Sequence, residues 1–271
     1  MNIAIIGTGR MGFTQAHLAR SMRDSLLWAV DISPQARAQF EEMFKVPVYE
    51  HISSPDYSDV ELLWITVKDA EIEPVAQALS DFLPKSVVVL HTSGLLPSSI
   101  LKKHLPNHSC ASFHPLMACP LCDVSDSDCV HAYEGVVHAY EGDEVALKIC
   151  HTLATRLQAK AVQIQPDKKI LYHAAAVFSA NYPGALIDIS AKLFEECGFS
   201  REQAVESAVL MCQQLLRSIL KSNPCEALTG PLKRRDFITV EAHIHALADH
   251  PNALLVYQVL KDACLDMLSN S

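Results

Sequence analysis

The sequence predicts an α/β fold in its N-terminal half and an all-α fold in its C-terminal half. In residues 1–165, short apolar runs of strand length alternate with helical segments, which is the order that builds a doubly wound, mainly parallel sheet. From residue 166 onward strand patterns disappear and long helical patterns follow. We therefore expect two domains, residues 1–165 and residues 166–271, each long enough to bury its own core.

The N-terminal half begins with a short apolar strand at residues 2–6, a helix at 13–23 and a second strand at 27–30. Further segments continue the same alternation, so the expected sheet has roughly seven or eight strands. The remaining expected strands are 46–49, 62–67, 87–91, 110–113, 135–138 and 161–164, and the remaining expected helices are 72–82 and 143–157.

The C-terminal half is expected to form helices at residues 168–197, 201–221, 239–248 and 253–268. Pro183 lies inside the first of them and should kink it, because proline cannot donate the helical hydrogen bond. The same helix holds the most apolar stretch, 174–189, but its Asn181 and Asp188 favour a buried helix over a membrane span. The stretch LTGPLKRRDF, 228–237, should be a loop because Gly230-Pro231 interrupts helices.

Charge and the start of the chain limit the classes of partner and the compartment. The formal net charge is −9, and no basic run is longer than Lys233-Arg234-Arg235, which argues against nucleic acid or an anionic membrane as the main partner. The opening MNIAIIGTG has no basic leader and no cleavage site, so a cytoplasmic protein without a membrane partner is expected.

Cysteine spacing offers only a weak metal signal. The 9 cysteines are an odd number, and reduced thiols are the expectation for such a chain. Zinc needs four sulfur or nitrogen ligands, and no second closely spaced pair follows Cys119-Pro-Leu-Cys122. We therefore expect no metal, although a zinc site remains an alternative. Its ligands would come from Cys110, His114, Cys119, Cys122, Cys129 and His131.

A glycine pattern after the first strand predicts a dinucleotide site. Gly7 permits a tight turn, Gly9 lets the backbone approach a pyrophosphate, and Gly12 lets helix and strand pack closely. Asp31, at the end of the second strand, is placed to bind ribose hydroxyls. The expected cofactor is NAD or NADP, and the loop residues that would bind it are Gly7, Thr8, Gly9, Arg10, Met11 and Gly12.

The coenzyme preference stays open between NAD and NADP. Asp31 should repel a 2′-phosphate, which favours NAD. Arg10, and Arg37 in the following helix, could offset this repulsion.

Residues that follow other strands are candidates for the nicotinamide and substrate end, because ligands of open α/β sheets bind beyond the carboxyl ends of the strands. They are Val67, His91, Ser93 and His114. A histidine at a strand end is about as often a structural hydrogen-bonding residue, so both interpretations stand.

Polar residues of the C-terminal half are candidates for chemistry on the substrate. Eight helical steps place Asn181 about 80° around the axis from His173, so both can face one broad side. His173 could protonate a carbonyl oxygen that Asn181 orients, and Arg234 could hold a carboxylate. Asp236 would orient Arg234, accept from a substrate hydroxyl, or simply cap the next helix.

Five ordered motifs, GTGRMG, HTSG, SFHPL, YHAAAVFSANY and LTGPLKRRD, carry a family resemblance. The chain resembles bacterial Rossmann-like proteins whose helical C-terminal half was long catalogued as a domain of unknown function. These are related to pyrroline-5-carboxylate reductase, deazaflavin-dependent NADP reductase and β-hydroxyacid dehydrogenases, and some members are alternative ketopantoate reductases.

The resemblance implies a Rossmann domain followed by a helical dimerisation domain, and hence a homodimer. It also implies site roles for His173, Asn181, Thr229, Arg234 and Asp236. The family usually has glycine where this chain has Arg235, which leaves the path of that loop open.

The expected function is that of an NAD(P)-dependent oxidoreductase that reduces a small 2-oxo carboxylic acid. The leading substrate is 2-dehydropantoate (ketopantoate), reduced to pantoate in pantothenate biosynthesis. Two alternatives remain: an imine reductase like pyrroline-5-carboxylate reductase, and a nicotinamide-binding sensor without turnover.

Overall fold

The computed structural model describes residues 1–117 and 131–270, and the chain divides into two compact units, Met1–Ala180 and Asn181–Ser271. Secondary structure changes from sheet to helix between Gln163 and Pro166, whereas the units divide later, inside a long helix. The expected domain boundary at residue 165 therefore stays a prediction. The units are called unit 1 and unit 2 below.

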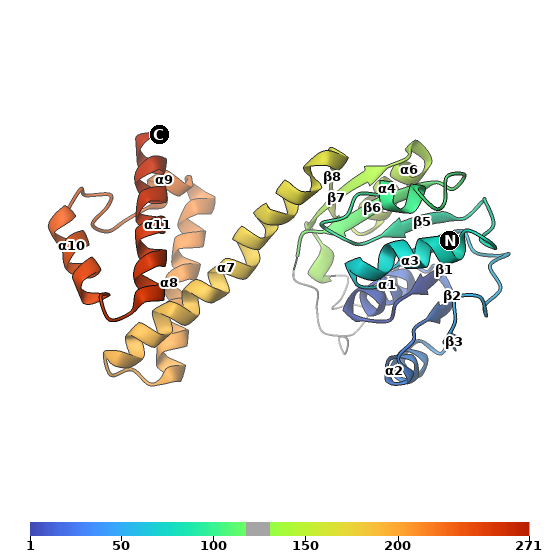
Figure 1. Ribbon diagram of the computed structural model, residues 1–271, viewed down its shortest axis with the longest axis horizontal. Coiled ribbons are helices and arrows are strands. Elements are labelled where there is room, and N and C mark those ends of the chain that lie inside the picture. Colours follow the sequence, from blue (N-terminus) through green and yellow to red (C-terminus); the bar gives the residue numbers. More distant parts are fainter. Residues whose placement is uncertain (118–130, 271) are drawn as a thin grey trace. The chain divides into compact units, whose positions relative to one another are not determined.

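Unit 1 is built on an eight-stranded sheet with the order β3-β2-β1-β4-β5-β6-β7-β8 (Figure 1). All neighbouring strands are parallel except β6 and β7, which are antiparallel. This confirms the α/β doubly wound fold. The strands are β1 Asn2–Ile6, β2 Ser25–Val30, β3 Val48–Tyr49, β4 Leu62–Ile65, β5 Val88–His91, β6 Cys110–Pro115, β7 Val137–Gly142 and β8 Lys160–Gln163.

The strand order reverses next to β1, whose two neighbours are β2 and β4. Such a reversal leaves a crevice beyond the carboxyl ends of the strands, because the following connections leave toward opposite faces. The turns after β1, β2 and β4 therefore meet at one place.

Helices cover both faces of the sheet (Figure 1). Phe13, Phe40 and Cys150 lie in the core on one face, and Ile72 and Leu101 lie in the core on the other. These apolar contacts hold the helices against the sheet. The helices are α1 Arg10–Ser21, α2 Pro34–Phe44, α3 Asp69–Leu79, α4 Ser99–Lys102 and α6 Glu144–Arg156.

Several expected boundaries differ from the structure for local reasons. Helix α1 begins at Arg10 rather than residue 13, because the glycine turn leads directly into it, and α3 begins at Asp69 rather than residue 72. Strand β7 spans Val137–Gly142 rather than 135–138, and its antiparallel pairing with β6 was not expected. The short helix α4 was missed, because one helical turn is too short to show a periodic pattern.

Helix α7, Lys169–Glu196, begins in unit 1 after the short 3-10 helix η1, Pro166–Lys168, and continues into unit 2. Pro183 lies inside α7, and the helix continues on both sides of it. The other helices of unit 2 are α8 Arg201–Lys221, α9 Pro224–Ala227, α10 Phe237–Ala246 and α11 Pro251–Ser269. Among the described residues, no helix combines the length and the apolar character needed to cross a membrane.

Residues that favour the start of a helix precede or begin two helices of unit 2. Ser200 and Gln203 form a reciprocal capping box at the start of α8, and Pro251 occupies the first turn of α11. The guanidinium of Arg201 pairs with the carboxylates of Asp188 and Glu195 and so fixes the turn between the end of α7 and α8.

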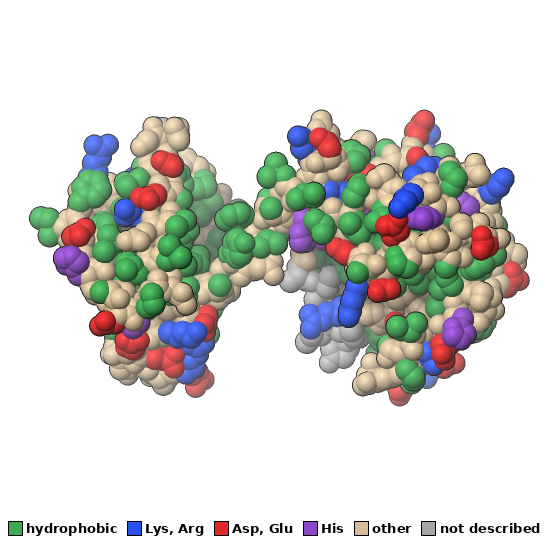
Figure 2. All heavy atoms as spheres, viewed as in Figure 1, with side chains coloured by type: hydrophobic (Ala, Val, Ile, Leu, Met, Phe, Trp, Pro, Cys, Tyr) green, Lys and Arg blue, Asp and Glu red, His purple; other side chains and the backbone are tan. Residues whose placement is uncertain are grey.

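Unit 2 buries small apolar side chains and leaves large ones at its surface. Its buried apolar residues are Ala191, Ala204, Ala208, Ala227 and Val240. Figure 2 shows hydrophobic side chains gathered over its helices. On α8 the exposed ones are Leu210, Met211, Leu215, Leu216 and Leu220, a set called here the α8 apolar surface.

Two glycines of the first turn allow a matched test of the close packing of α1. A Cβ on Gly12 would lie 2.0 Å from the carbonyl oxygen of Gly7, whereas a Cβ on Gly9 would meet nothing within 4 Å. Gly12→Ala should lower the free energy of unfolding by about 1–3 kcal/mol, as overpacking does. Gly9→Ala should cost less than about 1 kcal/mol. Thermal unfolding of both variants measures the difference, and equal melting temperatures would contradict it.

Candidate functional site

The turn after β1 is held by a small set of backbone contacts. Gly7 has φ +97°, a left-handed conformation that glycine adopts without strain, and its amide donates to the carbonyl of Val30 at 2.8 Å. The hydroxyl of Thr66 donates to the carbonyl oxygen of Gly7 at 2.6 Å. The turn is thereby fixed between the ends of β1, β2 and β4.

Helix α1 starts from this turn with features of an anion site. Gly9 is its N-cap residue, no side chain caps the helix, and its first turn has no acidic residue. The first amides of a helix point along its axis and carry partial positive charge, which favours a phosphate. Arg10, the first helical residue, is exposed there.

A pocket of about 370 Å³ lies beside this turn, within the size range of small-ligand sites. Of the expected cofactor residues, Gly7, Gly9, Asp31 and Val67 line it. The other lining residues are Ile6, Val30, Ile32, Glu50, Ile52, Thr66, Lys68, Glu71 and Val75.

Asp31 is fixed by three hydrogen bonds. One carboxylate oxygen accepts from the amide of Thr8 at 2.7 Å and from its hydroxyl at 2.9 Å, and the other oxygen accepts from the amide of Ser33 at 2.8 Å. A carboxylate has about four acceptor positions, so a further donor can still bind. Thr8 thus supports Asp31 from within the glycine turn.

A second polar group lies at the carboxyl end of β5 and along the neighbouring β6. The Lys169 ammonium, at the start of α7, donates to the carbonyl of Ser93 at 2.9 Å and to the hydroxyl of Ser112. Ser112 donates to the same carbonyl at 3.1 Å, and the amide of Ser93 donates to Nδ1 of His91 at 3.2 Å. The start of α7 is therefore tied to β6 and to the loop that follows β5.

Two more residues of α7 complete this group, called here the strand-end cluster. The hydroxyl of Tyr172 lies 2.8 Å from Nδ1 of His114. A Cβ on Gly94 would lie 2.9 Å from both Nε2 of His114 and Cδ2 of His173, so both rings pack closely against this glycine. The expected residues His91, Ser93, His114 and His173 thus belong to one neighbourhood in unit 1.

Burial sets the charges of the strand-end cluster. It lowers the pKa of His91 to about 3 and that of His114 to about 4, with the nearby Lys169 charge acting in the same direction. Both histidines are therefore neutral at pH 7. Burial also lowers the pKa of Lys169 to about 8, although the Glu141 carboxylate opposes this, and it raises the pKa of Tyr172 to about 12.

Lys169, like Ser112 and Tyr172 of this group, was not among the site residues expected from the sequence. Its side chain is only 1% exposed, which is unusual for lysine. Lys168 and Lys169 stand together before an apolar helix, and nothing in their order tells which is buried. The available signal was spacing, because Lys169 precedes His173 by one helical turn.

Four expected site residues, Asn181, Thr229, Arg234 and Asp236, belong to unit 2, and their roles stay predictions. Asp236 caps α10, accepting from the amide of Thr239 at 3.1 Å and its hydroxyl at 2.7 Å. These hydrogen bonds lower the pKa of Asp236. Residues 228–236 form a loop, as expected.

Arg235 explains how this loop does without the glycine usual in the resembling family. Its φ is +56°, in the left-handed region that glycine enters easily. Its amide donates to the carbonyl of Leu232 at 3.1 Å, and the amide of Asp236 donates to that of Pro231 at 2.9 Å. The backbone takes a path that suits glycine although an arginine occupies it.

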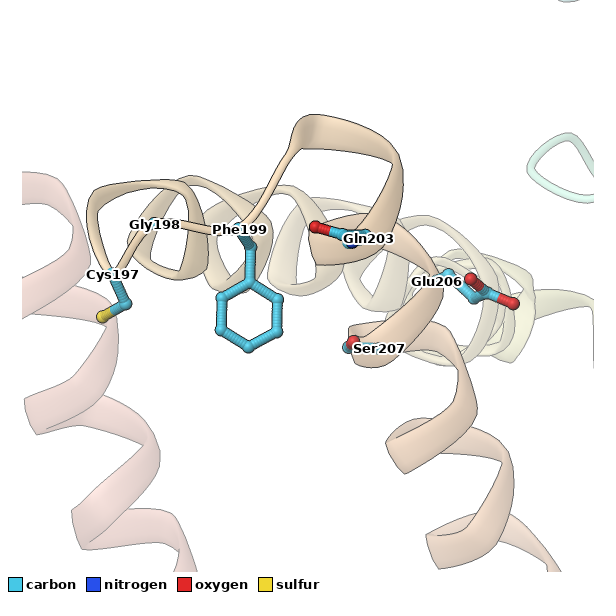
Figure 3. A pocket seen from close by; sticks show the side chains of 6 residues that line it. All are labelled: Cys197, Gly198, Phe199, Gln203, Glu206 and Ser207. Atoms are coloured by element: carbon cyan, nitrogen blue, oxygen red, sulfur yellow. The ribbon is translucent and has the colours of Figure 1, made fainter.

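Another hollow, of about 440 Å³, lies in unit 2 at the turn between α7 and α8 (Figure 3). Gln203, on its wall, is already used in the capping box. None of the expected site residues lines it. Its lining residues are Cys197, Gly198, Phe199, Gln203, Glu206 and Ser207.

The described residues contain no cluster of three or more histidine, cysteine, aspartate and glutamate side chains able to hold a metal ion. Cys110 is buried in the core, and burial raises the pKa of its thiol to about 12. The other cysteines of the alternative zinc site, Cys119, Cys122 and Cys129, lie outside the described residues.

Residues 136–264 match a protein family described as a domain of unknown function, DUF2520. This agrees with the resemblance expected from the motifs of the C-terminal half. No curated protein sequence matches the chain significantly.

Solved structures share the fold of the whole chain. A Thermotoga maritima protein, TM1727, is 22% identical with a TM-score of 0.77, covering 99% of this chain and 98% of its own. A Bacteroides fragilis protein provisionally named an NADP oxidoreductase is 18% identical, with a TM-score of 0.76 and 98% of both chains covered. Plasmodium falciparum pyrroline carboxylate reductase with NADP bound is 13% identical, with a TM-score of 0.64 and 98% of both chains covered.

Substitution of Arg235 tests its left-handed backbone. Arg235→Gly should raise the free energy of unfolding by up to about 1 kcal/mol, because glycine adopts this conformation without the steric cost of a Cβ. Arg235→Val should lower it by about 1 kcal/mol or more, since a branched side chain tolerates that region poorly. Denaturant unfolding ranks the three proteins, and a valine variant as stable as the glycine variant would refute the conformation.

Proposed function

We propose that the protein is an NAD(P)-dependent oxidoreductase that reduces a small substrate. The observation that carries the proposal is the pairing of two sites at the carboxyl edge of one sheet. The glycine turn with its Asp31 pocket follows β1 and β2, and the strand-end cluster lies at the end of β5 and along the adjacent β6. Fold similarity to an NADP-bound reductase supports it.

The residues of the first site fit a dinucleotide. Gly9 leaves open space beside the uncapped start of α1, where a pyrophosphate would bind. Asp31 keeps acceptor capacity for ribose hydroxyls, and Val67 would contact the cofactor from the end of β4. When bound, a reduced nicotinamide supplies the hydride.

In the strand-end cluster, Lys169 is our candidate for the proton donor. With a pKa near 8 it carries a proton at neutral pH and gives it up at lower cost than an ordinary lysine. Ser93 and Ser112 hold its ammonium in place, and the neutral His114, held by Tyr172, adds no competing charge. His173, one turn further along α7, is the second candidate for the donor.

Four polar residues of unit 2 keep, in this proposal, the roles that the sequence predicts for them. Arg234 has the planar donor geometry that suits a carboxylate, Asn181 could orient an oxygen, and Thr229 could donate a hydrogen bond. Asp236 would act by fixing the start of α10. The exposed large side chains of the α8 apolar surface support a homodimer, because a second copy of the chain would remove some of them from water, and the sedimentation mass of the purified chain tests it.

The proposed substrate class is a small 2-oxo carboxylic acid, with ketopantoate first. Imine reduction is the second candidate, because pyrroline carboxylate reductases from several organisms share the fold. A nicotinamide-binding sensor without turnover is the third.

Loss of reduced nicotinamide absorbance separates these candidates. Purified protein with ketopantoate should consume NADH or NADPH with saturable kinetics, and a pyrroline carboxylate assay serves as the comparison. Turnover only with the imine would exclude ketopantoate and keep the reductase. Coenzyme binding with no turnover on either substrate would favour the sensor.

Adjacent lysines provide a matched test of proton donation. Lys169→Met should lower kcat by about 10²-fold or more, whereas Lys168→Met, at a side chain that is 60% exposed, should leave it nearly unchanged. Lys169→Arg should remain impaired, because arginine keeps its proton at every working pH. The wild-type rate should fall as pH rises through about 8, where Lys169 loses its proton.

A Lys169→Met variant with wild-type turnover would remove Lys169 from the mechanism. If His173 supplies the proton instead, His173→Ala should lower kcat by about 10²-fold while Lys169→Met acts weakly. The two variants measured together therefore identify the donor.

A further inference from the structure

We infer that the ribose end of the pocket selects NAD(H) over NADP(H), and that Glu50 enforces this selection by holding Arg37. The inference rests on the proposed function, since it concerns the same coenzyme site. It answers a question that the sequence left open, namely whether a cation beside Asp31 offsets the repulsion between the Asp31 carboxylate and a 2′-phosphate.

Asp31 is rigidly placed as an acceptor. Its two oxygens receive hydrogen bonds from Thr8 and Ser33, so the carboxylate cannot turn away from the pocket that it lines without breaking them. A ribose hydroxyl can donate to such a group, whereas a phosphate in the same position meets like charge.

Arg37 stands beside Asp31 but its guanidinium is already engaged. Its Nη1 donates to the carbonyl oxygens of Asp31 at 2.9 Å and Ile32 at 3.0 Å, and its Nη2 donates to the carboxylate of Glu50 at 3.0 Å. Arginine binds phosphate best through two parallel donors, so this arrangement withholds the geometry that a 2′-phosphate needs.

The charged residues that line the pocket also favour NAD(H) over NADP(H). Among the described residues that line it, Asp31, Glu50 and Glu71 are acidic and Lys68 alone is basic. A 2′-phosphate would add close to two negative charges to this surface. Adenosine with free ribose hydroxyls adds none there.

Glu50 is the residue through which this selection can be changed without touching the ribose acceptor. Its side chain is 55% exposed and that of Arg37 is 19% exposed, so their ion pair is partly screened by water. A partly screened pair contributes modestly, which sets the expected change at a few-fold. Removing the Glu50 charge leaves at most a neutral hydrogen bond to Arg37, so its guanidinium turns more easily toward an incoming phosphate.

Direct binding of NADH and NADPH to the full chain tests the inference. Wild-type protein should bind NADH more tightly than NADPH. Glu50→Gln should lower the Kd for NADPH by about threefold to fivefold while changing that for NADH by less than about twofold. Glu42→Gln, an equal charge change at an exposed position of α2 outside the pocket, is the control and should change neither. Circular dichroism confirms that both variants are folded.

The outcomes separate this inference from the proposed function. A wild-type preference for NADPH, or equal effects of Glu50→Gln and Glu42→Gln, would overturn the inference and leave the oxidoreductase intact. Binding of neither coenzyme would overturn the proposed function and the inference with it. A selective gain in NADPH binding by Glu50→Gln alone supports both.

Discussion

The site region of unit 1 depends on how closely the start of α1 approaches the turn that follows β1. The distance between residue 12 and the carbonyl of Gly7 leaves no room for any side chain atom. Because of this approach, the first helical turn, Asp31 and the end of β4 meet at one pocket. The hydroxyl of Thr66 fixes the turn from the neighbouring strand, so the arrangement belongs to the sheet as much as to the glycines.

The strand-end cluster shows a second constraint, the cost of burying a charged lysine. A buried ammonium is tolerated only when it is hydrogen-bonded, and Lys169 finds its acceptors on Ser93 and Ser112. These contacts anchor the beginning of α7 to strands that are distant in sequence. The same desolvation that makes the position costly gives the lysine a pKa suited to proton transfer. Structural anchoring and the proposed chemistry thus share one physical origin.

The sequence predicted the fold well because its strongest signals are local. The apolar runs at 2–6 and 87–91 became strands, and the helix at 201–221 has the expected bounds. The strand at β7 was expected, but its antiparallel direction was not, because strand direction depends on pairing partners, which periodicity does not reveal. The site was predicted less completely. His91, Ser93 and His114 could be found from their positions after strands, whereas Lys169 is defined by burial that only packing shows.

The uneven distribution of apolar side chains in unit 2 has a consequence for its stability. Its buried apolar residues are mainly alanines, each of which contributes little hydrophobic free energy, while leucines of the α8 apolar surface contact solvent. Any molecule that covers those leucines would therefore supply a large share of the free energy that keeps these helices folded. If the cover is a second copy of the chain, the melting temperature of this half should rise with protein concentration, as mass action requires.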